Sequence, residues 1–141
     1  MSFDLSVLFK AEKMVTAARW ASAIREHGFE MTMVTDIDLR TLGGWLPCTW
    51  NGEDAGFEYY FTLASEDNFL AEMIEECGYV DFDASIMMSC RGEESVASGI
   101  AAAAVWAVLT GGVVSNPQQG TDVEAEKAIA WARQVIERKE F

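Results

Sequence analysis

The strongest constraint on the fold is a long stretch without any charged side chain, residues 95–121. Its first part is rich in alanine, and a helix over about 94–110 would be apolar on nearly every side, so it is stable only when other elements surround it. Alanine scarcely favours hydrocarbon, Gly111-Gly112 interrupts the run, and no Lys or Arg anchors its downstream side, so a membrane span is not expected. The stretch therefore predicts a buried helix at the centre of the fold.

Several other segments have the patterns of strands. Alternating apolar and polar residues, or short runs rich in branched and aromatic side chains, predict strands at residues 3–9, 29–34, 45–50, 57–63 and 85–90, with Val113-Val114 as a short addition. The third and fourth form a hairpin, because Asn51-Gly52 and Gly56 between them supply the positive φ angles of a reversal. Pro47 cannot donate a ladder hydrogen bond, so its strand is expected at a sheet edge or with a bulge.

Two segments before the charge-free stretch have the periodicity of amphipathic helices. The first covers about 12–27 and ends before Gly28, a residue that suits the left-handed end of a helix. The second covers about 65–77, with Ser65 as its N-terminal cap. Its buried stripe is expected to consist of five side chains: Phe69, Leu70, Met73, Ile74 and Cys77.

The last helix is expected after a turn at Asn116-Pro117, and Thr121 and Glu124 match a capping box at its start. The order of strands and helices predicts one α+β domain over residues 1–141. We expect an antiparallel or mixed sheet of four to five strands packed against about four helices, with the Ala-rich apolar helix at the centre.

Acidic residues dominate the charge of the chain. It has 23 acidic and 10 basic residues, a net charge of −13, and phosphate binding needs clustered Lys and Arg, so nucleic acid and anionic membranes are not expected as partners. Residues 41–90 contain no Lys or Arg. They contain ten acids: Glu53, Asp54, Glu58, Glu66, Asp67, Glu72, Glu75, Glu76, Asp81 and Asp83. This segment serves either solubility or attraction to a basic protein surface.

The N-terminal residues and the cysteines indicate a compartment. The first residues have no basic region and no small-residue cleavage site, so they do not resemble a secretory signal. The three cysteines, Cys48, Cys77 and Cys90, are an odd number at wide spacing without a CxxC pair. We therefore expect reduced thiols in a cytoplasmic protein.

Few residues suggest chemistry. His27, the single histidine, falls at a helix end, where it suits the bonding of terminal carbonyls better than the role of a base. The glycine pairs match no phosphate-binding loop. Asp36 with Asp38, and Asp81 with Asp83, could hold Mg²⁺ or Ca²⁺, but neither pair continues into a calcium-loop pattern. We therefore expect no enzyme activity, no cofactor and no metal.

Aromatic side chains among carboxylates are typical of the centre of a protein interface. The hairpin has such a mixture, and the 65–77 helix and the segment after it add further acids. The expected partner-binding residues are Trp45, Trp50, Glu53, Asp54, Glu58, Tyr59, Glu72, Glu75, Glu76, Asp81 and Asp83.

The C-terminal part of the chain resembles a known class of proteins. An Ala-rich apolar helix runs into TGGVVSNPQQG (residues 110–120), and a short amphipathic helix containing AIAWA follows. In a small, acidic α+β chain, this segment of about 95–135 is similar to bacterial immunity proteins, the cognate inhibitors of polymorphic and type VI secretion effectors. The resemblance implies an inhibitor that binds one toxin, often over its active site, and it transfers no catalytic residues.

The leading hypothesis is a non-enzymatic immunity protein that covers the basic substrate cleft of a cognate toxin with its acidic surface. One alternative is a small metal-dependent hydrolase or ligand-binding enzyme that uses the paired aspartates. Another is a subunit that associates with itself through an exposed strand edge. The sequence leaves the toxin's activity and the oligomeric state open.

Overall fold

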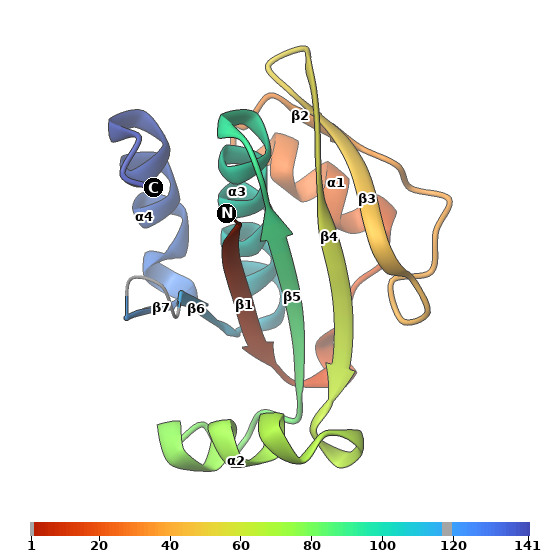
Figure 1. The fold of residues 1–141 in the computed structure, drawn as a ribbon, viewed down its shortest axis with the longest axis vertical. Coiled ribbons are helices and arrows are strands. Elements are labelled where there is room, and N and C mark those ends of the chain that lie inside the picture. The colour runs from red at the N-terminus through yellow and green to blue at the C-terminus, as the bar shows by residue number, and fades with distance from the viewer. Residues whose placement is uncertain (1, 117–119) are drawn as a thin grey trace.

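In the described part of the chain, seven antiparallel strands form one sheet, and three of the four helices lie against a single face of it (Figure 1). The computed structural model describes residues 2–116 and 120–141. The strands are β1 (Phe3–Phe9), β2 (Met31–Met33), β3 (Gly43–Trp50), β4 (Glu53–Leu63), β5 (Ala84–Cys90), β6 (Val113–Asn116) and β7 (Thr121–Glu124). The helices are α1 (Ala17–Glu26), α2 (Asn68–Cys77), α3 (Glu93–Thr110) and α4 (Ala125–Arg138). Short 3-10 turns cover Ala11–Lys13 and Ala64–Glu66.

The α+β class is confirmed, but the sheet is larger than predicted. Its strand order is β2-β3-β4-β5-β1-β6-β7. The prediction of four to five strands was wrong because the segment after α3 forms a hairpin, in which β6 pairs with both β1 and β7. Thr121–Glu124, expected as the capping box of the last helix, is the strand β7, and α4 begins only at Ala125. The turn expected at Asn116-Pro117 falls partly on residues 117–119, outside the described part of the chain.

The Ala-rich helix α3 lies at the centre, as predicted. It contacts five strands, β1 and β3 to β6, and lies between α1 and α4. Its residues from Ile100 to Ala107 are completely buried. Trp106 of α3 makes edge-to-face contacts with Trp20 of α1 and Phe9 of β1, at ring centroid distances of 4.8 and 5.3 Å. The indole N–H of Trp20 donates to the carbonyl of Ala102, 2.9 Å away, which fixes α1 against α3. No described helix is long and apolar enough to span a membrane.

One small residue sets how closely α3 approaches the sheet. A side chain at Gly99 would collide with the sulfur of Cys90 in β5. The helix backbone therefore lies directly against the strand, and this close packing requires glycine.

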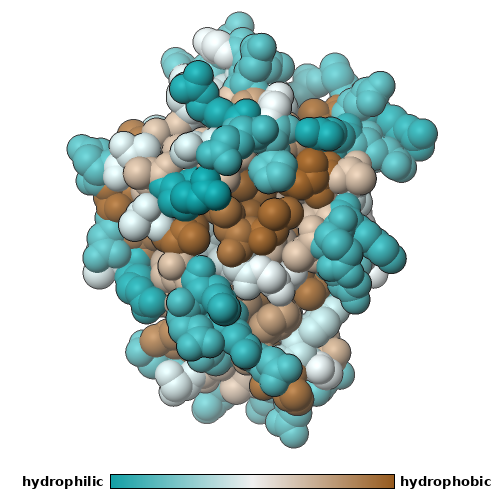
Figure 2. All heavy atoms as spheres, turned by 180° about the vertical axis from the view of Figure 1, so that it is seen from behind, coloured by the Kyte–Doolittle hydropathy of each residue, from teal (hydrophilic) through white to brown (hydrophobic). Residues whose placement is uncertain are grey.

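The face of the sheet toward these helices is apolar because every second strand residue points into it. The register places Leu5 of β1, Met88 of β5 and Tyr59 of β4 side by side on this face, and all three are completely buried. From behind, Figure 2 shows the helix side, with apolar residues in its middle and hydrophilic residues around them. On this side Arg133 of α4 donates to the carbonyl of His27 at the end of α1, 2.6 Å away.

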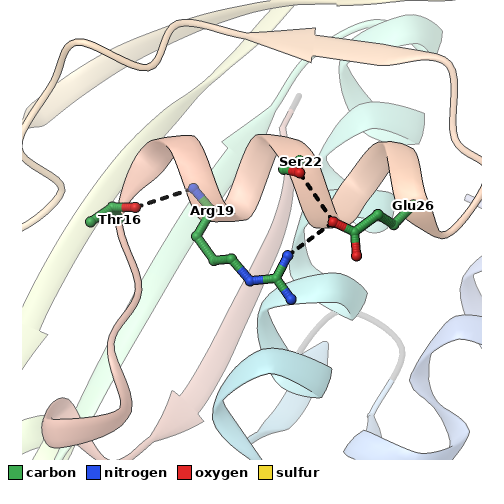
Figure 3. A network of polar contacts seen from close by, with 4 residues as sticks. All are labelled: Thr16, Arg19, Ser22 and Glu26. Carbon is green, nitrogen blue, oxygen red and sulfur yellow. Dashed lines mark hydrogen bonds and ion pairs between the residues drawn. The ribbon is translucent and has the colours of Figure 1, made fainter.

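Helix α1 is shorter than predicted, since the chain is still extended at Thr16. The Thr16 hydroxyl caps the helix by accepting from the N–H of Arg19, 3.1 Å away (Figure 3). On the exposed side of α1 the carboxylate of Glu26 accepts from the guanidinium of Arg19 and the hydroxyl of Ser22, at 3.1 and 3.0 Å (Figure 3). These polar bonds leave the opposite side of the helix free to pack on α3.

The predicted hairpin is present, with a tighter turn than expected. Only Asn51 and Gly52 separate β3 from β4, both at positive φ. Gly56, expected in the turn, pairs with Pro47 inside the ladder. Strand β3 is not an edge strand, but its pairing with the short β2 reaches only as far as Cys48, so Pro47 lies beyond that ladder.

Helix α2 lies across the lower end of the sheet in Figure 1. Asp67 rather than Ser65 caps it, with its carboxylate accepting from the N–H of Leu70 at 2.9 Å. Leu70 and Ile74 are buried, but Phe69 and Cys77, predicted to be buried with them, are exposed. Their burial was predicted wrongly because α2 packs through a narrow stripe on the side chain of Leu8, instead of on the main core.

Candidate functional site

The second face of the sheet is the candidate site, and we call it the open face. Figure 1 looks onto this face, with α1 and α3 behind the strands and α4 at the left, beyond β1. At the lower end, Leu70 and Ile74 of α2 cover Leu8. The hydroxyl of Tyr79, just after α2, donates to the carboxylate of Asp122 in β7 at 3.1 Å. The rest of the face, over β3, β4, β5 and β1, has no helix packed on it.

The strand register arranges the open face in rows. One row runs across four strands: Trp45, Glu58, Ser89 and Asp4. The next row runs beside it: Gly43, Tyr60, Met87 and Ser6. Residues in one row are direct cross-strand neighbours, and those in adjacent rows are diagonal neighbours within reach of aromatic side chains.

Three large apolar side chains are exposed in these two rows. Trp45 is 57% exposed, Tyr60 40% and Met87 38%. Tyr60 and Met87 are direct neighbours, and Trp45 is diagonal to Tyr60. We call these three side chains, which lie on three adjacent strands with Glu58 between the two rings, the apolar patch, and such patches mark interaction sites when polar residues rim them.

Gly56 and Glu58 position the two aromatic rings of this patch. A side chain at Gly56 would collide with the indole of Trp45, so the ring of Trp45 lies over the bare backbone there. The hydroxyl of Tyr60 donates to the carboxylate of Glu58, 3.0 Å away. This hydrogen bond, together with the negative charge of Glu58, raises the pKa of Tyr60 above its ordinary value.

The basic residues of the described chain lie outside the sheet and outside α2. None of the residues of the seven described strands is Lys or Arg, and neither is any residue of α2. The basic residues lie in α1, α4 and the connecting segments: Lys10, Lys13, Arg19, Arg25, Arg40, Arg91, Lys127, Arg133, Arg138 and Lys139. The open face therefore combines its apolar patch with the carboxylates of Asp4, Asp54 and Glu58, without a basic residue in its own strands.

The structure divides the predicted partner-binding residues of the hairpin between the two faces. Trp45, Asp54 and Glu58 lie on the open face. Trp50 and Glu53 lie next to the hairpin turn, and their register places them on the helix side of the sheet. There the ring of Trp50 packs against that of Phe29, with 6.1 Å between the ring centroids.

Tyr59 was predicted as a partner contact and is instead a core residue. Its side chain is completely buried, and its hydroxyl donates to the carbonyl of Leu39 at 2.7 Å. Burial raises the pKa of Tyr59 strongly. Its neighbour Tyr60 faces the open side, because successive residues of a strand point to opposite faces.

The predicted residues on and after α2 form a separate group. Glu72, Glu75 and Glu76 are exposed on α2, at the opposite end of the sheet from the hairpin turn (Figure 1). Asp81 is exposed in the segment that follows, whereas the carboxylate of Asp83 accepts from the N–H of Ala11 at 2.8 Å. The eleven residues therefore do not make one continuous surface.

Sequence reasoning missed Tyr60, Met87 and Asp4, which the register brings onto the same face as Trp45 and Glu58. The signal that could have found them is the period of two. In each strand the residues between the buried positions had to share one face.

One aspartate of each predicted pair accepts a backbone hydrogen bond. The carboxylate of Asp38 accepts from the N–H of Arg40 at 2.9 Å, and that of Asp83 bonds to Ala11. Within residues 2–116 and 120–141, no group of three or more potential ligand side chains comes together in a way that could hold a metal ion.

Comparisons with protein-family models, curated proteins and solved structures find no match for this chain.

Proposed function

We propose that this protein is a bacterial immunity protein, which binds a cognate toxin through the open face and covers the basic substrate cleft of that toxin. The observation that carries the proposal is the pairing of exposed Trp45, Tyr60 and Met87 with carboxylates on a face whose strands contain no basic residue. The resemblance of residues 95–135 to immunity proteins supports the same function.

The composition of the open face supports protein binding over an ordinary solvated sheet. Interface centres are enriched in Trp, Tyr and Met, and a few buried aromatic anchors carry most of the binding free energy. Trp45 and Tyr60 are such anchors, held in place by the backbone at Gly56 and by the carboxylate of Glu58. A partner that covers them removes apolar surface from water at a prearranged site.

The charge of the face supports a basic partner. The apolar patch alone would also suit a second copy of the chain, but two such faces would bring Asp54 and Glu58 against the same carboxylates of the other copy. The net charge of −13 adds to this repulsion. A nuclease or another enzyme that binds phosphate groups offers the complementary positive cleft.

The glutamates of α2 have a second role in the proposal. They lie beyond the lower end of the open face, and their exposed carboxylates extend its negative field. We expect them to increase the rate of encounter more than the lifetime of the complex, because exposed rim charges act mainly on association.

The test is capture of the partner followed by a protection assay. The tagged chain, incubated at low salt with lysate of its native host, is expected to retain a basic protein that mass spectrometry identifies. Cells that express the retained basic protein alone should stop growing, and co-expression of the proposed immunity protein should restore growth. The proposal is wrong if no basic protein is retained or if the retained protein is harmless.

A variant with Glu72, Glu75 and Glu76 all changed to Lys tests the role of α2. The association rate with the captured partner should fall, and the difference from the wild type should shrink as salt is added. An unchanged association rate at low salt would exclude these glutamates from the interaction.

A further inference from the structure

We propose that Trp45, Glu58 and Tyr60 form a seat for one arginine side chain of the partner protein. The inference rests on the proposed function, since it names the chemical group with which a basic partner meets the open face. The central contact would be an ion pair with Glu58, and the rings of Trp45 and Tyr60 would flank the guanidinium group.

The first observation is the place of Glu58 between two exposed rings. Glu58 is the direct cross-strand neighbour of Trp45, and its carboxylate accepts from the hydroxyl of Tyr60. One carboxylate oxygen, Oε2, receives that hydrogen bond. Each carboxylate offers about four acceptor sites, so Glu58 has capacity for further donors.

The second observation is the support of Trp45 by Gly56. Since the ring covers backbone without a side chain, one side of the indole rests on the strand. The ring is nevertheless 57% exposed, so much of its surface remains open to solvent beside Glu58. Cations bind over the faces of aromatic rings, and tryptophan is the strongest of these.

The third observation is that, among the described residues, Glu58 takes part in no ion pair. The ion pairs of the described residues join Arg19 to Glu26, Arg138 to Glu140 and Lys139 to Glu93, all outside the strands. No described strand contributes a Lys or Arg beside Glu58. The carboxylate therefore remains available to an incoming basic group.

Arginine fits this arrangement better than lysine. The guanidinium group is planar, so it can stack on Trp45 while its N–H groups donate to Glu58 in the same plane. It is also more weakly hydrated than an ammonium group, so covering it at an interface costs less. Lysine would form the ion pair without the stacked, paired hydrogen bonds.

The test uses N-acetyl-arginine amide as the probe and the five tryptophan indole N–H resonances of the ¹⁵N-labelled protein as the readout. The variant Trp45→Leu identifies the Trp45 resonance. At constant ionic strength the probe should shift this resonance in a saturable way, and the uncharged isostere N-acetyl-citrulline amide should not. N-acetyl-lysine amide should bind more weakly than the arginine probe.

Isosteric variants locate the binding. Glu58→Gln keeps the shape and the acceptor for Tyr60 but removes the charge, and it should weaken binding of the arginine probe about 10-fold. Glu137→Gln removes the same charge from the exposed side of α4 and should leave the affinity unchanged. The seat is excluded if arginine does not shift the Trp45 resonance, or if both variants behave alike.

Affinity measurements with the captured partner distinguish a failure of this inference from a failure of the proposed function. If Glu58→Gln leaves the affinity of a neutralised toxin unchanged, the seat is wrong and the immunity function stands. If the arginine probe binds at Trp45 but no toxin is captured, the seat stands and the immunity function is wrong. Faster sedimentation of the free chain with concentration, abolished by Trp45→Leu, would show that the open face binds a second copy, which contradicts both.

Discussion

Gly99 shows how a single residue sets the distance between the central helix and the sheet. Glycine is unfavourable inside a helix by about 1 kcal/mol relative to alanine, yet it occupies the middle of α3. The sulfur of Cys90 fills the space that a side chain would need. The sequence marks this position only as a small residue in an Ala-rich run, because the contact is made with a strand whose register the sequence does not reveal.

The variant Gly99→Ala should lower the free energy of unfolding by about 1–3 kcal/mol, because the added methyl group overpacks the contact with Cys90. Urea denaturation measures this change. Cys90→Ala removes the colliding sulfur, so the double variant should be more stable than the sum of the two single changes predicts, by about 0.5–3 kcal/mol. Additive changes would contradict the close approach of α3 to β5.

The three cysteines should differ in reactivity toward a thiol reagent. Cys77 is exposed, whereas Cys48 and Cys90 are buried. Burial raises the pKa of the Cys48 thiol, and it raises that of Cys90 to about 12, so little of the reactive thiolate forms at neutral pH. We expect one fast-reacting thiol in the native protein and three in denaturant. Cys77→Ser should abolish the fast reaction. A second fast thiol would show that Cys48 or Cys90 is not buried in the core.

Tyr60 should titrate above the ordinary pKa of tyrosine. Its neutral hydroxyl donates to Glu58, so this hydrogen bond is present at low pH and is lost as the pH rises through the raised pKa. Glu58→Gln removes the negative charge, and the pKa of Tyr60 should then fall. Carbon-13 NMR of labelled tyrosine rings measures it, with Tyr60→Phe to assign the signal. An identical titration in both proteins would show that the ring does not contact Glu58.

At the scale of elements, local patterns predicted most segments but not what each packs on. The central helix, the first strand and the β3–β4 hairpin follow from apolar periodicity and the Asn-Gly turn. Thr121 and Glu124 have capping-box spacing, yet they form β7, because pairing with β6 extends the sheet. Phe69 has the spacing of the buried stripe of α2, but that helix packs on a small cluster around Leu8, and the Phe69 side chain is left 76% exposed.

Helix α2 carries like charges at neighbouring helical positions, and this pattern lowers its stability. Glu72 and Glu76 are one turn apart, and the last turn of the helix has no basic residue. Glu76→Lys should raise the free energy of unfolding by a few tenths to about 1 kcal/mol at low salt, because it pairs with Glu72 and suits the helix C-terminus. Urea denaturation checks this, and Glu76→Gln separates loss of repulsion from gain of attraction. No stabilisation by Glu76→Lys would contradict the exposed geometry of α2.

At the scale of the whole molecule, the fold converts a run of sequence without basic residues into a sheet whose described strands contain none. The sequence shows a base-free segment over residues 41–90, and the fold extends it to all seven strands by placing every basic residue in helices or connections. The negative charge of the candidate surface was therefore predictable, but the set of residues that forms this surface was not. Alternation within β4 places Tyr60 on the same face as Glu58, but Asp4 joins Glu58 only through pairing of β1 with β5.

In the proposed function the open face, and not the helix layer, binds a basic protein. The decisive measurement is the dissociation constant of the captured partner for two matched variants, Glu58→Arg on the open face and Glu137→Arg on the exposed side of α4. We expect Glu58→Arg to weaken binding by about 10- to 100-fold and Glu137→Arg to change it by less than about 2-fold. Equal effects of the two changes, or a loss of binding only with Glu137→Arg, would contradict the account.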